Sequence, residues 1–207
     1  MAQIVSDNAD LIDAFKARNQ LSEAPEVADV FHAVRRIPYG SRGGRDLRTV
    51  VEHNEGSCSG KHILLRALLR HSGHQAEIET VRGDFTSRLT VHASMSPDLQ
   101  GMCRDGGVVD FHQYVVWTGA EGALKLDATW SDGPIQHGVP GNQDWSGSGD
   151  TTLALTPDAV LERVEDVPTY KQSLLACLSP EDQRHRLAFL SLLTEWVEGL
   201  ETMGGEI

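Results

Sequence analysis

The chain has 207 residues, of which 40% are hydrophobic and 23% are charged, close to the globular average, which excludes a disordered or collagen-like chain. The formal net charge is −12 at pH 7. Because so acidic a surface repels phosphate backbones and anionic lipids, we expect neither a nucleic acid nor a membrane as a partner.

Two further features of the sequence concern its location. No apolar run approaches the roughly 20 residues of a membrane-spanning helix, and residues 1–7 lack the basic and apolar regions of a signal peptide. We therefore expect a cytoplasmic protein. The three cysteines are Cys58, Cys103 and Cys177. An odd number in a cytoplasmic chain argues against a disulfide framework, and no two of them form a C-x-x-C pair.

The first third of the chain is predicted to be helical. Apolar residues at helical spacing predict helices over residues 10–19, from Pro25 to 34, over 47–53 and over 59–71. Residues 41–46 are rich in glycine and arginine and are predicted to be a loop. The helix over 59–71 has almost no polar face, so we expect it to be buried.

The middle of the chain is predicted to form strands, and the end to return to helices. Strands are predicted over 75–82, 89–93, 108–117 and 123–128, the last two as a hairpin around the turn at 119–122. Residues 95–107 and 131–150 are predicted loops, and helices are predicted over 158–163, 170–177 and 181–200. This order predicts an α+β fold. We expect one domain over residues 1–207, with its core at about 26–155 and C-terminal helices over 157–201.

Cys58 is predicted to open the buried helix, directly after Gly56 and Ser57. Free backbone N–H groups and the helix dipole stabilise a thiolate at such a position, and Lys61, one turn on, adds positive charge. The ordinary thiol pKa of ~8.5 falls in this setting, and the same N–H groups can receive an oxyanion. Taken alone, the position also suits a small core residue.

His112 and Asp127 supply partners for this thiol. They lie on the two strands of the predicted hairpin, where a four-residue turn would set them side by side. A carboxylate beside an imidazole fixes the orientation of the ring, and the second ring nitrogen can then face a thiol. His92 is a rival base and Asp132 a rival orienting group. Asp110 shares the strand face of His112, where it would either tune the site or be exposed.

Three segments in this order carry a resemblance. Residues 56–62 (GSCSGKH) with the Leu-rich helix, residues 111–116 (FHQYVV) and residues 126–130 (LDATW) resemble the Cys, His and Asp segments of the transglutaminase-like superfamily. Residues 37–40 (IPYG) resemble a segment of small, largely uncharacterised bacterial members. The resemblance implies a papain-like core, in which a helix bearing the cysteine packs on an antiparallel sheet, with extra N- and C-terminal helices outside it.

The resemblance also implies an activity. Cys58 would be the nucleophile, His112 its base and Asp127 the orienting carboxylate of a thiol-dependent amide or peptide hydrolase, or an acyltransferase, working through a thioester. No cofactor and no metal are implied. The substrate would be a peptide, or a small molecule or protein that carries an amide; the oligomeric state stays open.

Five residues are candidate substrate contacts: Tyr39, Ser57, His62, Trp130 and Trp145. Ser57 is a small neighbour of the thiol, and the tryptophans lie near the Asp strand and the long loop. His62 lies one turn after Cys58, where it equally suits a packing role. Tyr39 is also a candidate for the second oxyanion donor, with His53 and Asn54 as alternatives.

Two other functions compete with catalysis. The same fold could serve as a binding module whose cleft holds a partner without reacting. Cys58, His62, His112 and Asp127 could instead hold a metal ion, since the first two lie four apart on one helical face.

Overall fold

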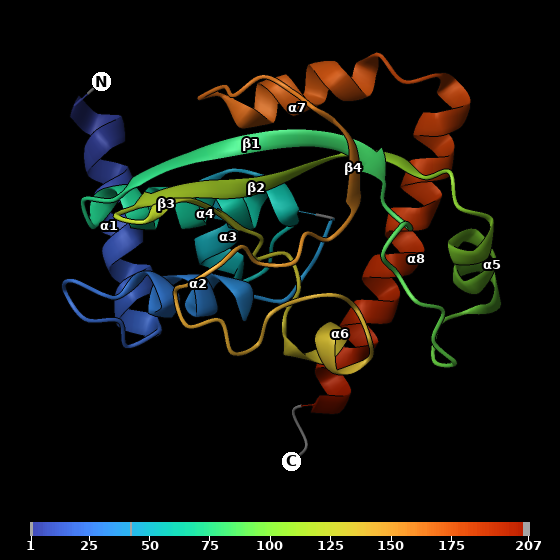
Figure 1. The fold of residues 1–207 in the computed structure, drawn as a ribbon, viewed down its shortest axis with the longest axis horizontal. Helices are drawn as coiled ribbons and strands as arrows, with labels where there is room; N and C mark the ends of the chain where they lie inside the picture. The colour runs from blue at the N-terminus through green and yellow to red at the C-terminus, as the bar shows by residue number, and fades with distance from the viewer. Residues whose placement is uncertain (1, 42, 205–207) are drawn as a thin grey trace.

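The computed structural model describes residues 2–41 and 43–204, and it describes side chains from residue 8 to residue 201 within these ranges. The fold is α+β, as the order of predicted elements indicates (Figure 1). The helices are α1 (Ala2–Arg18), α2 (Val27–Arg35), α3 (Leu47–His53), α4 (Cys58–His71), α5 (Pro97–Asp105), α6 (Asp132–Gln136), α7 (Val167–Ala176) and α8 (Pro180–Gly204). The strands are β1 (Gln75–Asp84), β2 (Val109–Gly119), β3 (Gly122–Leu126) and β4 (Thr156–Val160).

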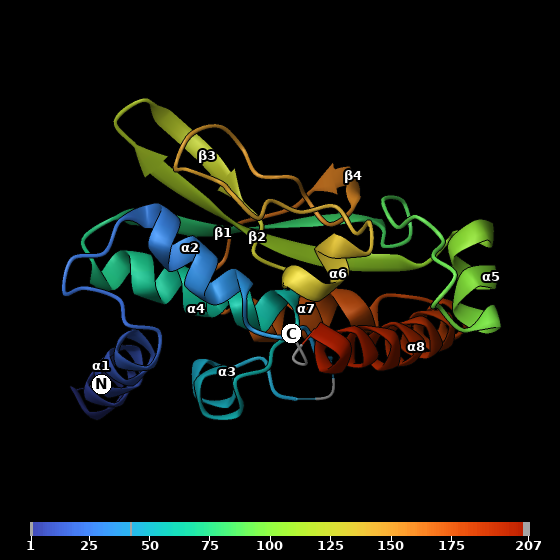
Figure 2. The same cartoon turned by 90° about the horizontal axis from the view of Figure 1, so that it is seen from below.

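The four strands form one antiparallel sheet in the order β3-β2-β1-β4. Strand β1 pairs with β2 along its whole length, and the pairing of β1 with β4 shifts register between Arg82 and Gly83. The sheet is curled, and Figure 2 shows α2, α4, α7 and α8 on one side of it. Helix α4 contacts β1 and β2 directly, and α7 and α8 also reach β2. The first residue of α4 therefore lies between the sheet and the C-terminal helices.

Helix α4 is buried as its sequence predicts. Leu64, Leu65, Leu68 and Leu69 are inaccessible to solvent or nearly so. At the start of the helix, glycine allows a close approach of α3: a Cβ added at Gly60 would lie 2.7 Å from a methyl carbon of Val50. Contact with the sheet on one side and α3 on another fixes the position of the first turn of α4.

Two predicted elements are wrong. Residues 89–93 do not form a strand but an irregular segment between two turns. The Leu89 N–H donates to the Thr86 carbonyl in the first turn, and the Met95 N–H donates to the His92 carbonyl in the second. Residues 158–163 do not form a helix; the segment instead supplies the edge strand β4. Both faces of β4 are largely open, with Val160 64% exposed. Such a strand needs no alternation of polar and apolar residues, so the pattern could not reveal it.

Two short helices lie in predicted loops. Helix α5 lies in the predicted loop 95–107; Ser96 caps it by accepting from the Leu99 N–H, and Pro97 takes a first-turn position. This is the same start signal that the sequence shows at Ser179 and Pro180, before α8. Helix α6 lies in the predicted loop 131–150. Pro25 is not the first residue of α2, which begins at Val27 with Glu26 as its cap.

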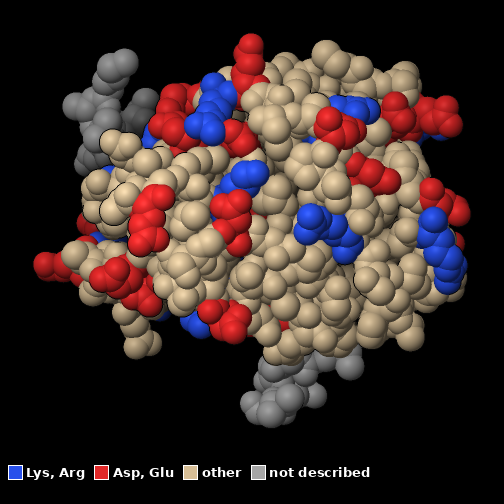
Figure 3. All heavy atoms as spheres, in the orientation of Figure 1, with Lys and Arg blue, Asp and Glu red and all other residues tan. Residues whose placement is uncertain are grey.

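Charge is mixed on the surface. Figure 3 shows Asp and Glu spread over one face of the molecule, with Lys and Arg among them. Within the residues that the structure describes, no helix is both long and apolar enough to cross a bilayer.

Candidate active site

The His112 ring is held by Asp127. The distance between His112 Nε2 and the Asp127 Oδ2 oxygen is 2.7 Å, and both side chains are buried. The hairpin turn has two residues rather than the predicted four, since Gly119 pairs with Gly122. Asp127 follows the last residue of β3 and therefore reaches His112 diagonally rather than from the directly opposite position.

The carboxylate of Asp127 is itself fixed by three further donors. Its Oδ1 accepts from the N–H and the hydroxyl of Thr129, and its Oδ2 accepts from the Ala154 N–H at 2.7 Å. The Asp127 N–H donates to the Thr151 hydroxyl at 2.7 Å. Although burial raises the pKa of Asp127, the charge and hydrogen bond of His112 outweigh it and hold that pKa well below the usual range. The carboxylate therefore stays ionised and fixes the ring.

The imidazole of His112 is cationic over a wide pH range. Burial lowers the pKa of His112, but the Asp127 carboxylate and then Cys58 raise it, to a net value of about 10. Its Nδ1 atom is buried and makes no hydrogen bond of regular geometry within the described residues. Cys58 raises the pKa of His112 and His112 lowers that of Cys58, so the thiol and the imidazole are close enough to stabilise each other's charged form.

Cys58 begins α4, and its side chain is only 2% exposed. Its sulfur lies 3.6 Å from Lys171 Nζ, 3.8 Å from the Ser59 hydroxyl and 3.9 Å from the Gln113 side-chain oxygen. Burial raises the pKa of the thiol, but the Lys171 ammonium and then His112 outweigh burial and lower that pKa to about 6. At neutral pH the pair is therefore a thiolate beside an imidazolium.

Sequence reasoning missed the polar residues that surround the sulfur. Gln113, next to His112 on β2, accepts from the Ser59 hydroxyl at 2.7 Å and from Lys171 at 3.2 Å. Lys171 comes from α7, far from Cys58 in the chain. The sequence spacing could have indicated that Lys171 is buried. Lys171 follows the apolar Val167 by four residues and therefore lies on the same buried face of the helix.

Asp110 joins this group from the start of β2. It is buried, so it is not exposed at the strand's start. Its Oδ1 accepts from Arg186 Nε at 2.7 Å and lies 3.9 Å from Lys171 Nζ. Burial raises the pKa of Asp110, but the two cations hold it below the usual range. The spacing of Arg186 likewise indicates burial, because it lies on the same face of α8 as the buried residues Phe189, Leu190 and Leu193.

Lys61 interacts with the charge of Cys58, as the sequence predicts, but its hydrogen bonds lie elsewhere. Its ammonium is buried and donates to three carbonyls, those of Arg35, Ile37 and Thr129, at 2.7–2.9 Å. Burial lowers the pKa of Lys61 to about 7. The cation that chiefly stabilises the thiolate is therefore Lys171. Lys61 instead joins the end of α2 to the segment after Asp127.

His62 is fully buried, so the structure favours packing over substrate contact. Its Nε2 accepts from the Ala128 N–H at 2.8 Å and lies 3.5 Å from Asp127 Oδ1. Burial lowers the pKa of His62 to about 3, more than Asp127 raises it. The neutral ring therefore carries its proton on Nδ1, and it anchors the backbone beside Asp127.

The other candidate contacts divide into two groups. Ser57 and Tyr39 are close to the thiol: Ser57 caps α4 without using its side chain, and the pKa of Tyr39 is raised by burial and then by Cys58. Trp130 packs on Tyr39, with ring centroids 4.9 Å apart. Trp145 is not a cleft residue. It is buried in the core against Phe31, with ring centroids 5.0 Å apart.

The rival residues lie elsewhere. Asp132 forms an ion pair with Arg35 at 2.6 Å and does not hold His112. The ring of His92 bonds to Ser94 instead of facing the thiol. His53, the last residue of α3, and Asn54, which caps the helix, are both exposed. Among the described residues, no group of three or more His, Cys, Asp or Glu side chains is placed to hold a metal ion.

Comparison with known proteins gives no match among family models, curated proteins or solved structures. The support for any function therefore comes from the geometry of the site.

Proposed function

We propose that the protein is a thiol-dependent hydrolase or acyltransferase acting on an amide or peptide carbonyl, with a transglutaminase-like, papain-like arrangement of Cys58, His112 and Asp127. The observation that carries the proposal is the buried thiol at the start of α4, whose pKa falls to about 6 beside an imidazole that Asp127 holds at 2.7 Å. A stable core needs no such low pKa, whereas a nucleophile that works near neutral pH does.

The reaction follows from these protonation states. The Cys58 thiolate attacks the carbonyl carbon, and the carbonyl electron pair moves to the oxygen. When the tetrahedral intermediate collapses, the C–N bond breaks and the His112 imidazolium gives its proton to the departing amine. A thioester remains on Cys58. His112, now neutral, takes a proton from water or from an acceptor amine, which attacks the thioester carbonyl; the C–S bond then breaks, and the Cys58 thiolate and the His112 imidazolium are restored.

The start of α4 suits the oxyanion. The first N–H groups of a helix have no partner within it, and the Ser57 side chain makes no capping hydrogen bond that would occupy one. These N–H groups and the helix dipole can stabilise negative charge on the former carbonyl oxygen. Lys171, 3.6 Å from the sulfur, adds a nearby positive charge.

The activated thiol is tested by alkylation with iodoacetamide, followed by mass-spectrometric mapping of Cys58, Cys103 and Cys177. We expect Cys58 to react fastest at neutral pH and its rate to rise through about pH 6. A Cys58 rate no higher than that of the exposed Cys177 would contradict the proposal. Incubation with a panel of amides and peptides should then produce an acylated enzyme whose added mass maps to Cys58 and is absent from Cys58→Ser.

One observation favours a second function, a binding module that does not react. Cys58 is only 2% exposed, and the Lys171 ammonium lies 3.6 Å from its sulfur. In a pure binding module this burial would be permanent, and the thiol would be inert. Slow labelling of Cys58 at every pH, together with saturable binding of a peptide, would support the binding module.

A further inference from the structure

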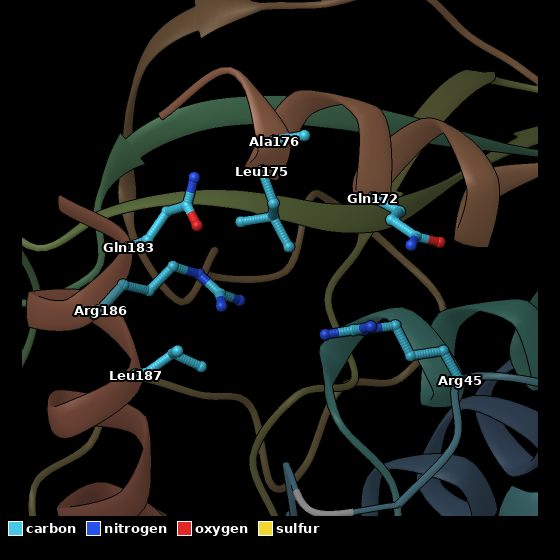
Figure 4. A pocket seen from close by; sticks show the side chains of 7 residues that line it. All are labelled: Arg45, Gln172, Leu175, Ala176, Gln183, Arg186 and Leu187. Carbon is cyan, nitrogen blue, oxygen red and sulfur yellow. The ribbon is translucent and has the colours of Figure 1, made fainter. Parts of the chain in front are cut away.

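A hollow opens next to the thiol, between the C-terminal helices and the segment before α3. It consists of two adjoining parts of about 150 Å³ and about 310 Å³, which share Arg45, Arg186 and Leu187. Figure 4 shows Arg45 and Arg186 extending toward each other across the larger part, below α7. The smaller part reaches Ser57 and Lys171 and so ends beside Cys58.

The charges around the hollow do not balance. Three cations line it, from Arg45, Lys171 and Arg186. Arg186 Nε is paired with Asp110, and Lys171 stands 3.6 Å from the thiolate. Arg45 has neither a hydrogen bond nor an ion pair with any residue that the structure describes. One positive charge therefore faces the hollow without a counterion, in a chain whose net charge is −12.

Two further features point to a ligand. The Ser57 hydroxyl is buried beside the smaller part and has no hydrogen-bond partner among the described residues. A buried hydroxyl without a partner is costly, so a group that fills this space would relieve it. Leu187, 62% exposed, forms an apolar wall of the larger part together with Leu175 and Ala176. The hollow thus combines a positively charged end with an apolar side.

We propose that this hollow binds the carboxylate of the substrate, so that the preferred donor is an amide or peptide with a free carboxylate and an apolar group close to the bond that breaks. The proposal rests on the proposed function and specifies its substrate class. A guanidinium matches a carboxylate with two parallel hydrogen bonds. One unbalanced positive charge suits a single negative charge. Lys171 contacts both the hollow and the sulfur, and so brings a bound carboxylate next to the reacting atoms.

Two alkylating reagents of nearly equal size test the anion pocket. Iodoacetate is an anion and iodoacetamide is neutral, and each alkylates a thiolate with loss of iodide. The quantity compared is the rate of iodoacetate labelling divided by the rate of iodoacetamide labelling. We expect this ratio to be at least about fivefold higher at Cys58 than at Cys177 of the same molecules, because an unpaired cation near Cys58 attracts the anion. The excess should shrink in high salt.

Arg45→Gln should lower this ratio at Cys58, and Arg45→Lys should restore part of it. Arg104→Gln is the matched control, because Arg104 is exposed and donates to Gln100 on α5, and it should leave the ratio unchanged. An equal ratio at Cys58 and Cys177, unaffected by Arg45→Gln, would overturn the carboxylate pocket. Fast iodoacetamide labelling of Cys58 in that same experiment would leave the proposed function standing.

A second measurement does not need a reactive thiol. Cys58→Ser protein is titrated with hexanoate and, separately, with hexanamide, and the arginine side-chain signals are followed by NMR. We expect saturable shifts with hexanoate and none with hexanamide. In Cys58→Ser/Arg45→Gln the shifts with hexanoate should be lost. The absence of saturation with hexanoate, or equal binding of the amide, would overturn the proposal even if Cys58 proved inert.

Discussion

The ammonium of Lys171 lies 3.6 Å from the sulfur of Cys58, although the two residues are 113 positions apart. Helix α7 thus brings to the thiol a cation from outside the nucleophile segment. The same ammonium lies 3.2 Å from Gln113 and 3.9 Å from Asp110, so it joins the C-terminal helices to β2 at the site. The C-terminal helices are therefore part of the site's electrostatics.

Removing this cation should make the thiol less acidic. In Lys171→Met, burial of Cys58 is no longer opposed by the ammonium, and we expect its pKa to rise from about 6 toward or above the ordinary ~8.5. The ultraviolet absorbance of the thiolate, followed against pH, measures this directly. Lys171→Arg keeps the charge and should keep most of the low pKa. Lys16→Met removes a half-buried lysine that donates to the Glu23 carbonyl, and it should leave the titration unchanged. An unchanged titration in Lys171→Met would show that His112 alone activates the thiol.

Removing the charge of Asp127 should lower the pKa of His112. In Asp127→Asn, burial of the imidazole is opposed chiefly by the smaller effect of Cys58, so the pKa of His112 should fall well below its value of about 10. NMR titration of the ring reports this shift. Turnover of any donor found by screening should fall by about two to four orders of magnitude, because the imidazolium that protonates the leaving amine is lost.

Asp132→Asn is the matched control for this variant, since Asp132 was the rival carboxylate and pairs with Arg35. It should leave the His112 titration in place. If the pKa of His112 stayed at its wild-type value in Asp127→Asn and fell in Asp132→Asn, the orienting carboxylate would be Asp132 instead of Asp127.

The parts of the site that the sequence could predict are those fixed by local pattern. The helix start at Cys58 and the hairpin carrying His112 and Asp127 follow from hydrophobic periodicity and turn residues. Lys171 and Arg186 could not be assigned, because their contacts depend on how α7 and α8 dock onto β2. A charged residue in an apolar helical stripe does signal a buried partner, but the sequence does not say which one.

The errors in the fold have a related cause. Strand β4 is specified by pairing with β1 rather than by its own residues, so the sequence of residues 158–163 predicts a helix where the structure has a strand. The burial of Trp145 against Phe31 likewise depends on how the long loop folds back over α2. In each case a contact distant in sequence decides the outcome, and periodicity within a segment carries no information about it.

The neutral ring of His62 should destabilise the protein in mild acid. The pKa of His62 is about 3 in the folded state and ~6.5 when unfolded, so below ~6.5 the unfolded chain binds a proton that the folded one does not. His112 has a raised pKa, and its stabilisation is fully present below ~6.5 and lost only as pH rises through about 10. Asp127 has a lowered pKa, and its contribution is present above ~3.8 and lost as pH falls through the folded value.

Among these three groups, His62 alone changes its contribution between about pH 4 and 6.5. The free energy of unfolding should therefore fall with decreasing pH in this window, with a slope from His62 of at most ~1.4 kcal/mol per pH unit. His62→Gln keeps an acceptor for the Ala128 N–H but cannot titrate, so its slope should be flatter. Urea unfolding at several pH values measures both slopes, and parallel curves for the two proteins would assign the acid sensitivity to other groups.

The close approach of α3 to the first turn of α4 gives a prediction about stability and reactivity together. In Gly60→Ala the new methyl group would lie 2.7 Å from Val50 Cγ2, so either α3 or the start of α4 must shift. We expect a loss of about 1–3 kcal/mol in the free energy of unfolding, and a changed Cys58 labelling rate, because Cys58 belongs to the same turn.

Gly101→Ala is the matched control: Gly101 also lies in a helix, α5, with nothing within 4 Å of the added Cβ. There the better helix propensity of alanine should stabilise the protein by up to ~1 kcal/mol. Val50→Ala in the Gly60→Ala background should restore the labelling rate if the clash is the cause, and a failure to do so would place the effect in the backbone of the turn itself.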